Sequence, residues 1–275
     1  MKFALCNEVL APLLFAEQCR VAAALGYMGL EVAPYTVCED PATMSDGQAR
    51  ALAQIAADHG LAISGLHWLL VKPAGLSITS PDQAVHARTV AFMRRLSELC
   101  AAMGGKYLVH GSPKQRLIEP GQTKAAAVAR ATEAFALAGV AARDNGVTYC
   151  IEPLSADQTP LVNTVAEAAA IVRAIDNPHL RTMIDTSSAG LAESESIADL
   201  ITRWMPTGLI AHVQVNDPNR RGPGQGAMKF APVLHALRAT GYGGVVAAEP
   251  FDYVPDGMGS AAHAIGYLRG LTEGI

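Results

Sequence analysis

Three segments of the sequence end in a carboxylate that follows a short apolar run. They are 147–153 with Glu152, 180–186 with Asp185, and 245–250 with Glu249. Each run could be a strand that is buried on both faces, which would leave its acid at the rim of a buried sheet. Three converging acids repel one another unless a cation lies between them, and a divalent metal ion meets that need. The alternative is that each acid caps the helix that follows it or pairs with an arginine.

A fourth polar side chain, Gln214, ends the apolar segment 209–214 and would stand beside the three acids. Three carboxylates and one amide oxygen form an all-oxygen ligand set, which favours Mg²⁺ or Mn²⁺ over Zn²⁺, with Co²⁺ as a further candidate. His212 lies two residues earlier and points to the same face of the strand. Because Gln214 is nearer the strand end, we predict it as the ligand and His212 as a deeper partner or core histidine. The two residues remain alternatives.

Polar residues that follow other strands could contact a substrate. The loop 216–226 carries Arg220 and Arg221 among glycines and could fold over an anionic or hydroxylated ligand. An ordinary surface turn is the alternative for this loop. Further candidates stand at the ends of other apolar segments: Asn7, His67 with the apolar wall of Trp68, and His110.

A repeated pattern of helix, glycine and strand predicts how these side chains are positioned. Glycine suits the left-handed position after a helix, as at Gly60 before the strand 61–67. Helical periodicity fills the intervals between strands, over 84–103, 124–145, 164–175, 196–204, 230–239 and 261–271. Eight such strands imply an α/β fold, a (β/α)8 TIM barrel of one domain, residues 1–275. Its chemistry belongs at the carboxyl ends of the strands, where the polar residues stand, while the strand interiors are nearly all apolar. A doubly wound open sheet is the alternative, but no G-x-G-x-x-G motif follows the first strand.

Bulk composition agrees with one large globular domain. The chain has 275 residues, of which half are apolar and 17% are charged. Its net charge of −4 and the lack of a basic stripe predict no nucleic-acid partner. No apolar stretch approaches the roughly 20 residues that span a bilayer, so we expect no membrane partner. Five cysteines without a C-x-x-C pair predict reduced thiols and a cytoplasmic location.

The chain resembles the xylose isomerase-like barrels known as sugar phosphate isomerases/epimerases, near the ketose 3-epimerases and hydroxypyruvate isomerases. The resemblance covers essentially the whole chain and is sharpest in Ile151-Glu152-Pro153-Leu154, Met183-Ile184-Asp185-Thr186, 219–226 and Glu249-Pro250-Phe251. It implies that Glu152 and Glu249 are both metal ligands and the acid/base pair. It also implies that Asp185 and Gln214 complete the ligands of one metal ion, and that Arg220 binds substrate.

Two positions depart from the ketose 3-epimerase pattern. Those enzymes carry a substrate-contacting His three residues after the metal-binding Asp, where this chain has Ser188. They carry a second Glu six residues after the first, where this chain has Gln158. We place both residues among the predicted substrate contacts. Gln at the third ligand position is more similar to hydroxypyruvate isomerases and some dehydratases of the superfamily.

The resemblance predicts an isomerase that moves a proton on a sugar or keto acid through a metal-stabilised ene-diolate. Returning the proton from the opposite face would epimerise the substrate, and shuttling it along one face would interconvert aldose and ketose. A metal-dependent dehydratase of a keto-polyol needs the same four ligands and is the main alternative. An abasic-site endonuclease and a barrel without catalysis are further alternatives. A homo-oligomer is compatible with all of them.

Overall fold

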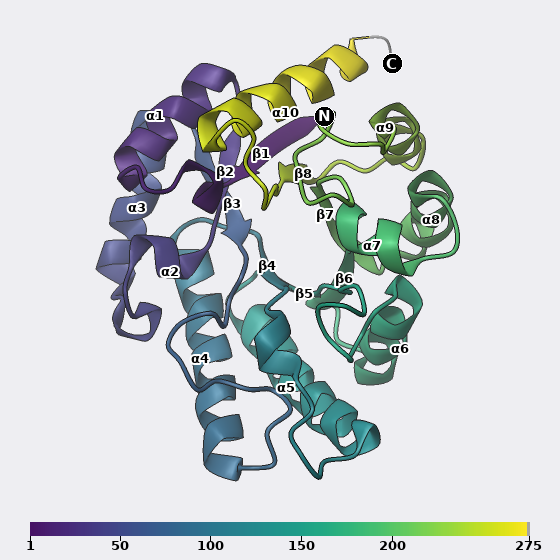
Figure 1. Ribbon diagram of the computed structural model, residues 1–275. Coiled ribbons are helices and arrows are strands. Elements are labelled where there is room, and N and C mark those ends of the chain that lie inside the picture. The colour runs from purple at the N-terminus through teal and green to yellow at the C-terminus, as the bar shows by residue number, and fades with distance from the viewer. Residues whose placement is uncertain (274–275) are drawn as a thin grey trace.

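Eight parallel strands form a closed barrel in sequence order in the computed structural model, which describes residues 1–273 (Figure 1). The strands are β1 (Lys2–Cys6), β2 (Gly29–Val32), β3 (Ala62–Leu66), β4 (Tyr107–His110), β5 (Thr148–Ile151), β6 (Leu180–Asp185), β7 (Ile210–Val215) and β8 (Val245–Ala248). Residues 2–5 of β1 pair with residues 245–248 of β8, which closes the barrel. The predicted (β/α)8 barrel is confirmed.

Helices surround the strands (Figure 1). The described α-helices are α1 (Phe15–Leu25), α2 (Pro34–Val37), α3 (Asp46–Asp58), α4 (Gln83–Ala102), α5 (Lys124–Asp144), α6 (Val165–Ile175), α7 (Thr186–Ala192), α8 (Ile197–Trp204), α9 (Phe230–Ala239) and α10 (Gly257–Thr272). Short 3-10 helices are η1 (Asn7–Leu10), η2 (Pro41–Thr43), η3 (Pro113–Arg116) and η4 (Met205–Thr207). The predicted helices agree with these bounds to within one residue, except that α10 begins at Gly257 and not at residue 261. Glycines at its start hide the apolar periodicity, and the side chain of Asp256 caps its first turn.

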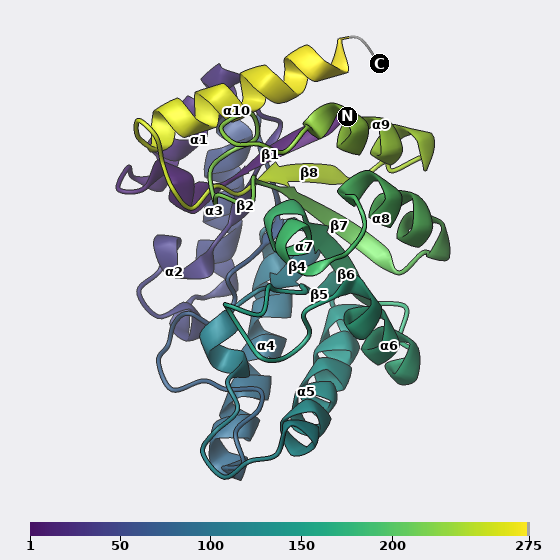
Figure 2. The same cartoon turned by 45° about the vertical axis from the view of Figure 1, so that its right-hand side comes forward.

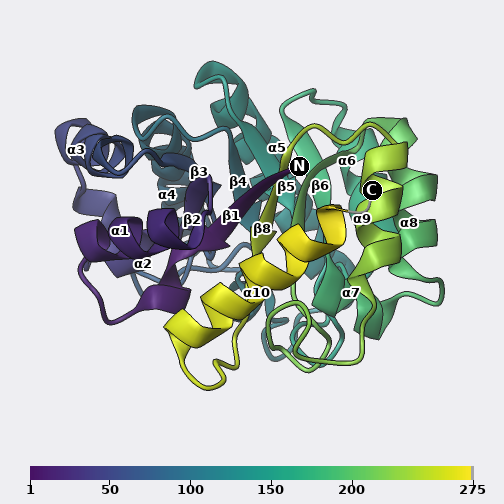
Figure 3. The same cartoon turned by 90° about the horizontal axis from the view of Figure 1, so that it is seen from above.

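The last helix covers the seam where the barrel closes. Figures 2 and 3 show α10 outside β1 and β8, and it contacts α1, η1 and β8. A Cβ at Gly257 would lie 1.8 Å from the carbonyl oxygen of Val9, so glycine allows α10 to begin directly against η1. The last helix of the described chain, α10, therefore packs directly against η1.

Helix α5 corrects one sequence-based statement. Its length and apolar composition would suit a membrane span, although we expected no such stretch. In the fold it packs against α4 and β5, and its buried face is rich in alanine and carries Phe135. The apolar residues of α5 are thus explained by its packing against neighbouring elements of the barrel.

The interior of the barrel is not apolar throughout, which corrects a second statement. Glu31, Tyr107, His212 and Gln214 are buried inside it. The strand register shifts between Leu30 and Glu31 and between Thr182 and Met183, and such irregularities re-aim side chains. Beyond the second shift, Gln214 of β7 pairs directly with Asp185 of β6.

Candidate active site

A cavity of about 490 Å³ lies beyond the carboxyl ends of the strands. The segment after every one of the eight strands contributes to its lining. A second cavity, of about 520 Å³, is lined by strand beginnings such as Lys2, Gly29 and Val245 at the opposite end of the barrel. Glu152 and Asp185 line the first cavity, and Glu249 lies beside them, so this cavity is the candidate active site although it is slightly smaller.

Three buried acids meet beside this cavity, and two of them, Glu152 and Asp185, line it. Glu152, Asp185 and Glu249 each offer a carboxylate oxygen within 4.8 Å of the others, and none is more than 4% exposed. Burial raises the pKa of Asp185 to about 6 and that of Glu249 to about 8. Burial, followed by the charges of Glu249 and Asp185, raises the pKa of Glu152 as well. The cluster therefore favours protonation or a neutralising cation.

Asp185, Glu249 and Gln214 share one feature: in each side chain, one polar atom makes a hydrogen bond and the other polar atom has no partner. The held contacts are Asp185 Oδ1 with the Ser188 N–H at 2.7 Å, Glu249 Oε1 with His67 Nδ1 at 2.8 Å, and Gln214 Nε2 with Glu31 Oε1 at 2.7 Å. Within the described residues, Asp185 Oδ2, Glu249 Oε2 and Gln214 Oε1 are buried without a hydrogen-bond partner. Buried acceptors are normally satisfied, so these oxygens fit a divalent cation that prefers hard oxygen ligands.

Glu152 is placed by its neighbours on β4 and the following loop. A Cβ at Gly111 would lie 1.6 Å from Glu152 Oε2, so any other residue there would displace the carboxylate. The fully buried Arg116 donates to the backbone oxygen of Glu152 at 2.7 Å and to that of His110. This guanidinium joins the ends of β4 and β5 and adds a positive charge near the acids.

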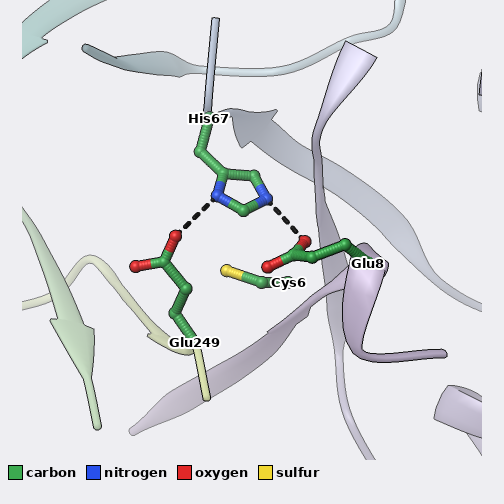
Figure 4. Close-up of side chains that lie close together, drawn as sticks. All are labelled: Cys6, Glu8, His67 and Glu249. Atoms are coloured by element: carbon green, nitrogen blue, oxygen red, sulfur yellow. Dashed lines mark hydrogen bonds and ion pairs between the residues drawn. The ribbon is translucent and has the colours of Figure 1, made fainter. Parts of the chain in front are cut away.

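His67 lies between two carboxylates and is fully buried (Figure 4). Its Nδ1 is 2.8 Å from Glu249 Oε1 and its Nε2 is 2.9 Å from Glu8 Oε2. Burial alone would lower the pKa of His67, but the charge of Glu8 and the hydrogen bonds to both acids raise it well above the usual value. The thiol of Cys6 completes this cluster, and burial and nearby acids raise its pKa, which keeps it protonated. His67 is not among the residues that line the cavity, and its two ring nitrogens face the acids that it orients. Its contact with a substrate stays a prediction.

Another buried carboxylate, Glu31, contacts several polar side chains inside the barrel, among them Gln214. Its Oε2 accepts from the Tyr107 hydroxyl at 2.6 Å and lies 2.8 Å from His212 Nε2, although that contact lacks hydrogen-bond geometry. Burial would raise the pKa of Glu31, but His212, together with His67 and Tyr107, lowers it to about 2. His212 stacks on Tyr107 with ring centroids 3.9 Å apart. It therefore lies deeper than Gln214 and contacts a partner of Gln214.

Four of the predicted substrate residues do line the cavity: Trp68, Gln158, Ser188 and Arg220. Trp68 adopts a positive φ of 49° and stacks on Phe251 at 5.7 Å between ring centroids, with Tyr35 at 6.1 Å. These rings form an aromatic wall.

Gln158 and Ser188, the two of these residues that depart from the ketose 3-epimerase pattern, are neighbours in the structure. Gln158 Nε2 donates to Ser188 Oγ at 3.4 Å and also to Ser155 Oγ at 2.9 Å. The positions 158 and 188 therefore form one polar patch on the cavity wall.

The two arginines of the loop after β7 face different ways. Arg220 lines the cavity and its guanidinium pairs with Asp157 at 2.8 Å at the rim. Arg221 pairs with Asp252 at 2.7 Å and is not part of the described lining. The carbonyl oxygen of Arg220 accepts from the N–H groups of Phe251 and Asp252, which anchors the loop to the segment after β8.

Two further predicted contacts, Asn7 and His110, lie outside the cavity lining, and their contact with a substrate stays a prediction. Asn7 donates to Gln18 at 2.9 Å and to Thr36 at 2.7 Å, and its oxygen accepts from the Ala33 N–H. Its polar atoms are therefore used to join η1 to the segment after β2. His110 is fully buried, and its Nδ1 lies 2.7 Å from the Tyr149 hydroxyl.

The sequence did not predict the roles of two residues of the site, Glu8 and Arg116. Glu8 lines the cavity in place of Asn7, because η1 begins at Asn7 and its tight turn redirects the chain after β1. An acid two residues after the end of β1 was a usable signal for Glu8. The sequence shows that Arg116 belongs to the loop after β4, but its burial and its carbonyl partners depend on the path of that loop.

Comparisons with known proteins agree with this architecture. The family model described as xylose isomerase-like TIM barrel matches residues 19–271. The D-psicose 3-epimerase of Agrobacterium fabrum is 29% identical over 240 residues, which cover 86% of this chain and 79% of that protein. The L-ribulose 3-epimerase of Mesorhizobium japonicum is 28% identical over 218 residues, which cover 77% of this chain and 68% of that protein. A solved structure of L-ribulose 3-epimerase superposes with a TM-score of 0.85 at 22% identity, over 99% of this chain and 95% of that chain, and shows the shared fold.

The relatives are named epimerases, and epimerases are isomerases, so the prediction of an isomerase is confirmed. The predicted resemblance is confirmed too, since the matching model spans nearly the whole chain. The chain belongs to the xylose isomerase-like TIM barrel family.

Proposed function

We propose that this chain is a divalent-metal-dependent epimerase or isomerase of a sugar or keto acid, with a reaction similar to that of ketose 3-epimerases. The carrying observation is the cluster of Glu152, Asp185 and Glu249, which each offer a carboxylate oxygen within 4.8 Å of the others. Among the described residues, Asp185 Oδ2, Glu249 Oε2 and Gln214 Oε1 have no hydrogen-bond partner. The names of the related epimerases support the type of reaction.

Four side chains would hold one Mn²⁺ or Mg²⁺ ion: Glu152, Asp185, Gln214 and Glu249. When bound, the ion would neutralise the acids and stabilise negative charge that develops on the substrate oxygens. The all-oxygen donor set supports these ions over Zn²⁺.

Glu152 and Glu249 would move the proton. One carboxylate removes a proton from the carbon beside the substrate carbonyl, and the other returns a proton to the opposite face, which inverts that carbon. In the metal-free protein, burial raises the pKa of both groups, and a bound cation would counter that rise. His67 keeps one oxygen of Glu249 engaged and leaves the other facing its neighbours.

The cavity wall would bind the rest of the substrate. Arg220 can donate forked hydrogen bonds to hydroxyl or carboxylate oxygens, while Gln158 and Ser188 offer neutral donors and acceptors. The wall of Trp68 and Phe251 can cover the apolar C–H face of a sugar. All five cysteines are free thiols, which supports the proposal of a reducing, cytoplasmic compartment.

The test is a screen of ketoses and keto acids with the Mn²⁺-loaded protein in deuterated water, followed by NMR. We expect product that carries solvent deuterium at the reacting carbon, with most turnover lost in Glu152→Gln and in Glu249→Gln. Glu133→Gln is the matched control, since Glu133 is exposed on α5, and it should retain full activity. An active parent whose product carries no deuterium would refute proton transfer with solvent exchange, and a dehydrated product would favour the lyase alternative.

A further inference from the structure

The side-chain amide of Gln214 has two unlike ends, and only its oxygen can bind a cation. An amide N–H₂ group is a donor with no free lone pair for a metal. Gln214 is fully buried beside Asp185 in the strand register. The orientation of this one amide therefore decides whether the barrel offers a ligand or a repelling N–H₂ group at that place.

Glu31 provides a physical reason for one orientation. Its Oε1 accepts from Gln214 Nε2 at 2.7 Å, while Gln214 Oε1 has no partner among the described residues. Gln214 pairs with Asp185 in the strand register, so without Glu31 the amide would gain by turning its N–H₂ group towards that carboxylate. The hydrogen bond to a carboxylate in a buried site is strong enough to oppose that rotation.

Glu31 is itself held on its other oxygen. The Tyr107 hydroxyl donates to Oε2 at 2.6 Å, and His212 Nε2 lies 2.8 Å from the same oxygen. All of these side chains are buried inside the barrel, so the carboxylate has little freedom to leave Gln214. The pairing joins β2 to β7 across the barrel interior.

We propose that Glu31 is a positioning residue that holds the Gln214 amide with its oxygen free for a cation bound at the acid cluster. This inference rests on the proposed metal-dependent function and adds a residue that lies below the site. Partners that orient a ligand in this way typically change metal affinity by about 10–100-fold when they are removed.

The experiment measures Mn²⁺ binding to the metal-free protein by electron paramagnetic resonance of the free ion, so it does not depend on knowing the substrate. Glu31→Gln presents its own N–H₂ group to either Gln214 or Tyr107 and His212, and we expect Mn²⁺ affinity to fall by about 10–100-fold. Ser64→Ala is the matched control. It removes a buried polar atom that contacts Tyr107 and the Leu30 carbonyl but neither Glu31 nor Gln214, and the affinity should stay within about threefold of the parent.

A double-mutant cycle with Gln214→Leu tests whether Glu31 affects Mn²⁺ affinity through the Gln214 amide or in some other way. If Glu31 acts through Gln214, Glu31→Gln should have no further effect on Mn²⁺ affinity in the Gln214→Leu background. Glu31→Asp keeps the charge but draws it back from Gln214, and serves as a second variant if Glu31→Gln does not fold by circular dichroism.

The outcomes are distinguishable. A parent protein that binds no Mn²⁺ contradicts the proposed function itself. Weak binding by Gln214→Leu, together with parent-like binding by folded Glu31→Gln and Glu31→Asp, leaves the function standing and overturns the role of Glu31. Equal losses for Glu31→Gln in both backgrounds would also overturn it, because the effect would not pass through the amide.

Discussion

Replacing Asp185 by Asn should stabilise the metal-free protein at neutral pH. The cap of α7 survives, because the Asn oxygen can still accept from the Ser188 N–H as Asp185 Oδ1 does at 2.7 Å. The unpartnered Oδ2 becomes an N–H₂ group in a cluster where Glu152 and Glu249 each have an oxygen within 4.8 Å of one carboxylate oxygen of Asp185, so a small side-chain shift would let it donate to one of them. The substitution thus removes a buried charge and supplies a missing donor.

The pKa of Asp185 sets the expected magnitude. Burial raises it from 3.8 to about 6 in the folded chain, which corresponds to about 3 kcal/mol. Because the folded-state pKa is the higher one, the free energy of unfolding of the parent falls as pH rises from about 4 to about 6. Asp185→Asn should therefore gain about 2–3 kcal/mol at pH 7 and almost nothing below pH 4. For a chain of this size the gain raises Tm by roughly 4–10 °C.

Calorimetry of the chelated proteins between pH 4 and pH 8 measures this effect. The matched control is Asp82→Asn, which makes the same change at the exposed cap of α4 and should shift stability by no more than about 0.5 kcal/mol. With saturating Mn²⁺ the order should reverse, since the parent gains binding free energy that the variant lacks. Equal Tm values for the parent and Asp185→Asn across the pH range would refute the reasoning, because Asp185 would then carry no buried charge.

Two further predictions concern residues that contact the site but do not belong to the acid cluster. Gly111→Ala should displace the Glu152 carboxylate, because the new Cβ would lie 1.6 Å from its Oε2. Turnover should fall by about 100-fold, while Tm should hardly change because the end of the Glu152 side chain can move. A variant that unfolds, or a folded variant with parent-like turnover, would contradict this. Arg220→Ala should lower kcat/KM by about 10–150-fold, the equivalent of about 1.5–3 kcal/mol for a charged hydrogen bond, without changing Mn²⁺ affinity. Arg221→Ala should have little effect on kinetics, and equal small losses for both variants would make the loop an ordinary surface turn.

The fold was predictable because its signals are local. Helix α9 has the predicted bounds of 230–239, since its apolar spacing lies within ten residues and needs no distant partner. Strand β8 and its terminal Glu249 could be identified in the same way, because an apolar run before an acid and a proline is readable in six residues.

The interior network was not predictable, because its partners are far apart in sequence. Glu31 and Gln214 are separated by 183 residues and meet only after the barrel closes. The register shift beside His212 also changes which residues of β6 and β7 are opposite each other. A strict alternation of faces along a strand cannot anticipate that shift. The 3-10 turn of η1, which brings Glu8 and not Asn7 to the cavity, is likewise not readable from the alternation in β1.

The contact between Gln158 and Ser188 has a consequence for changing the selectivity of this cavity. The two residues are 30 positions apart in the sequence, yet Gln158 donates to the Ser188 hydroxyl. A substitution at either position therefore also removes a partner of the other, so the two residues act as one neutral unit of the wall. Variants that introduce a charge here should be made at both positions together, because a single change would leave the remaining polar group without its partner.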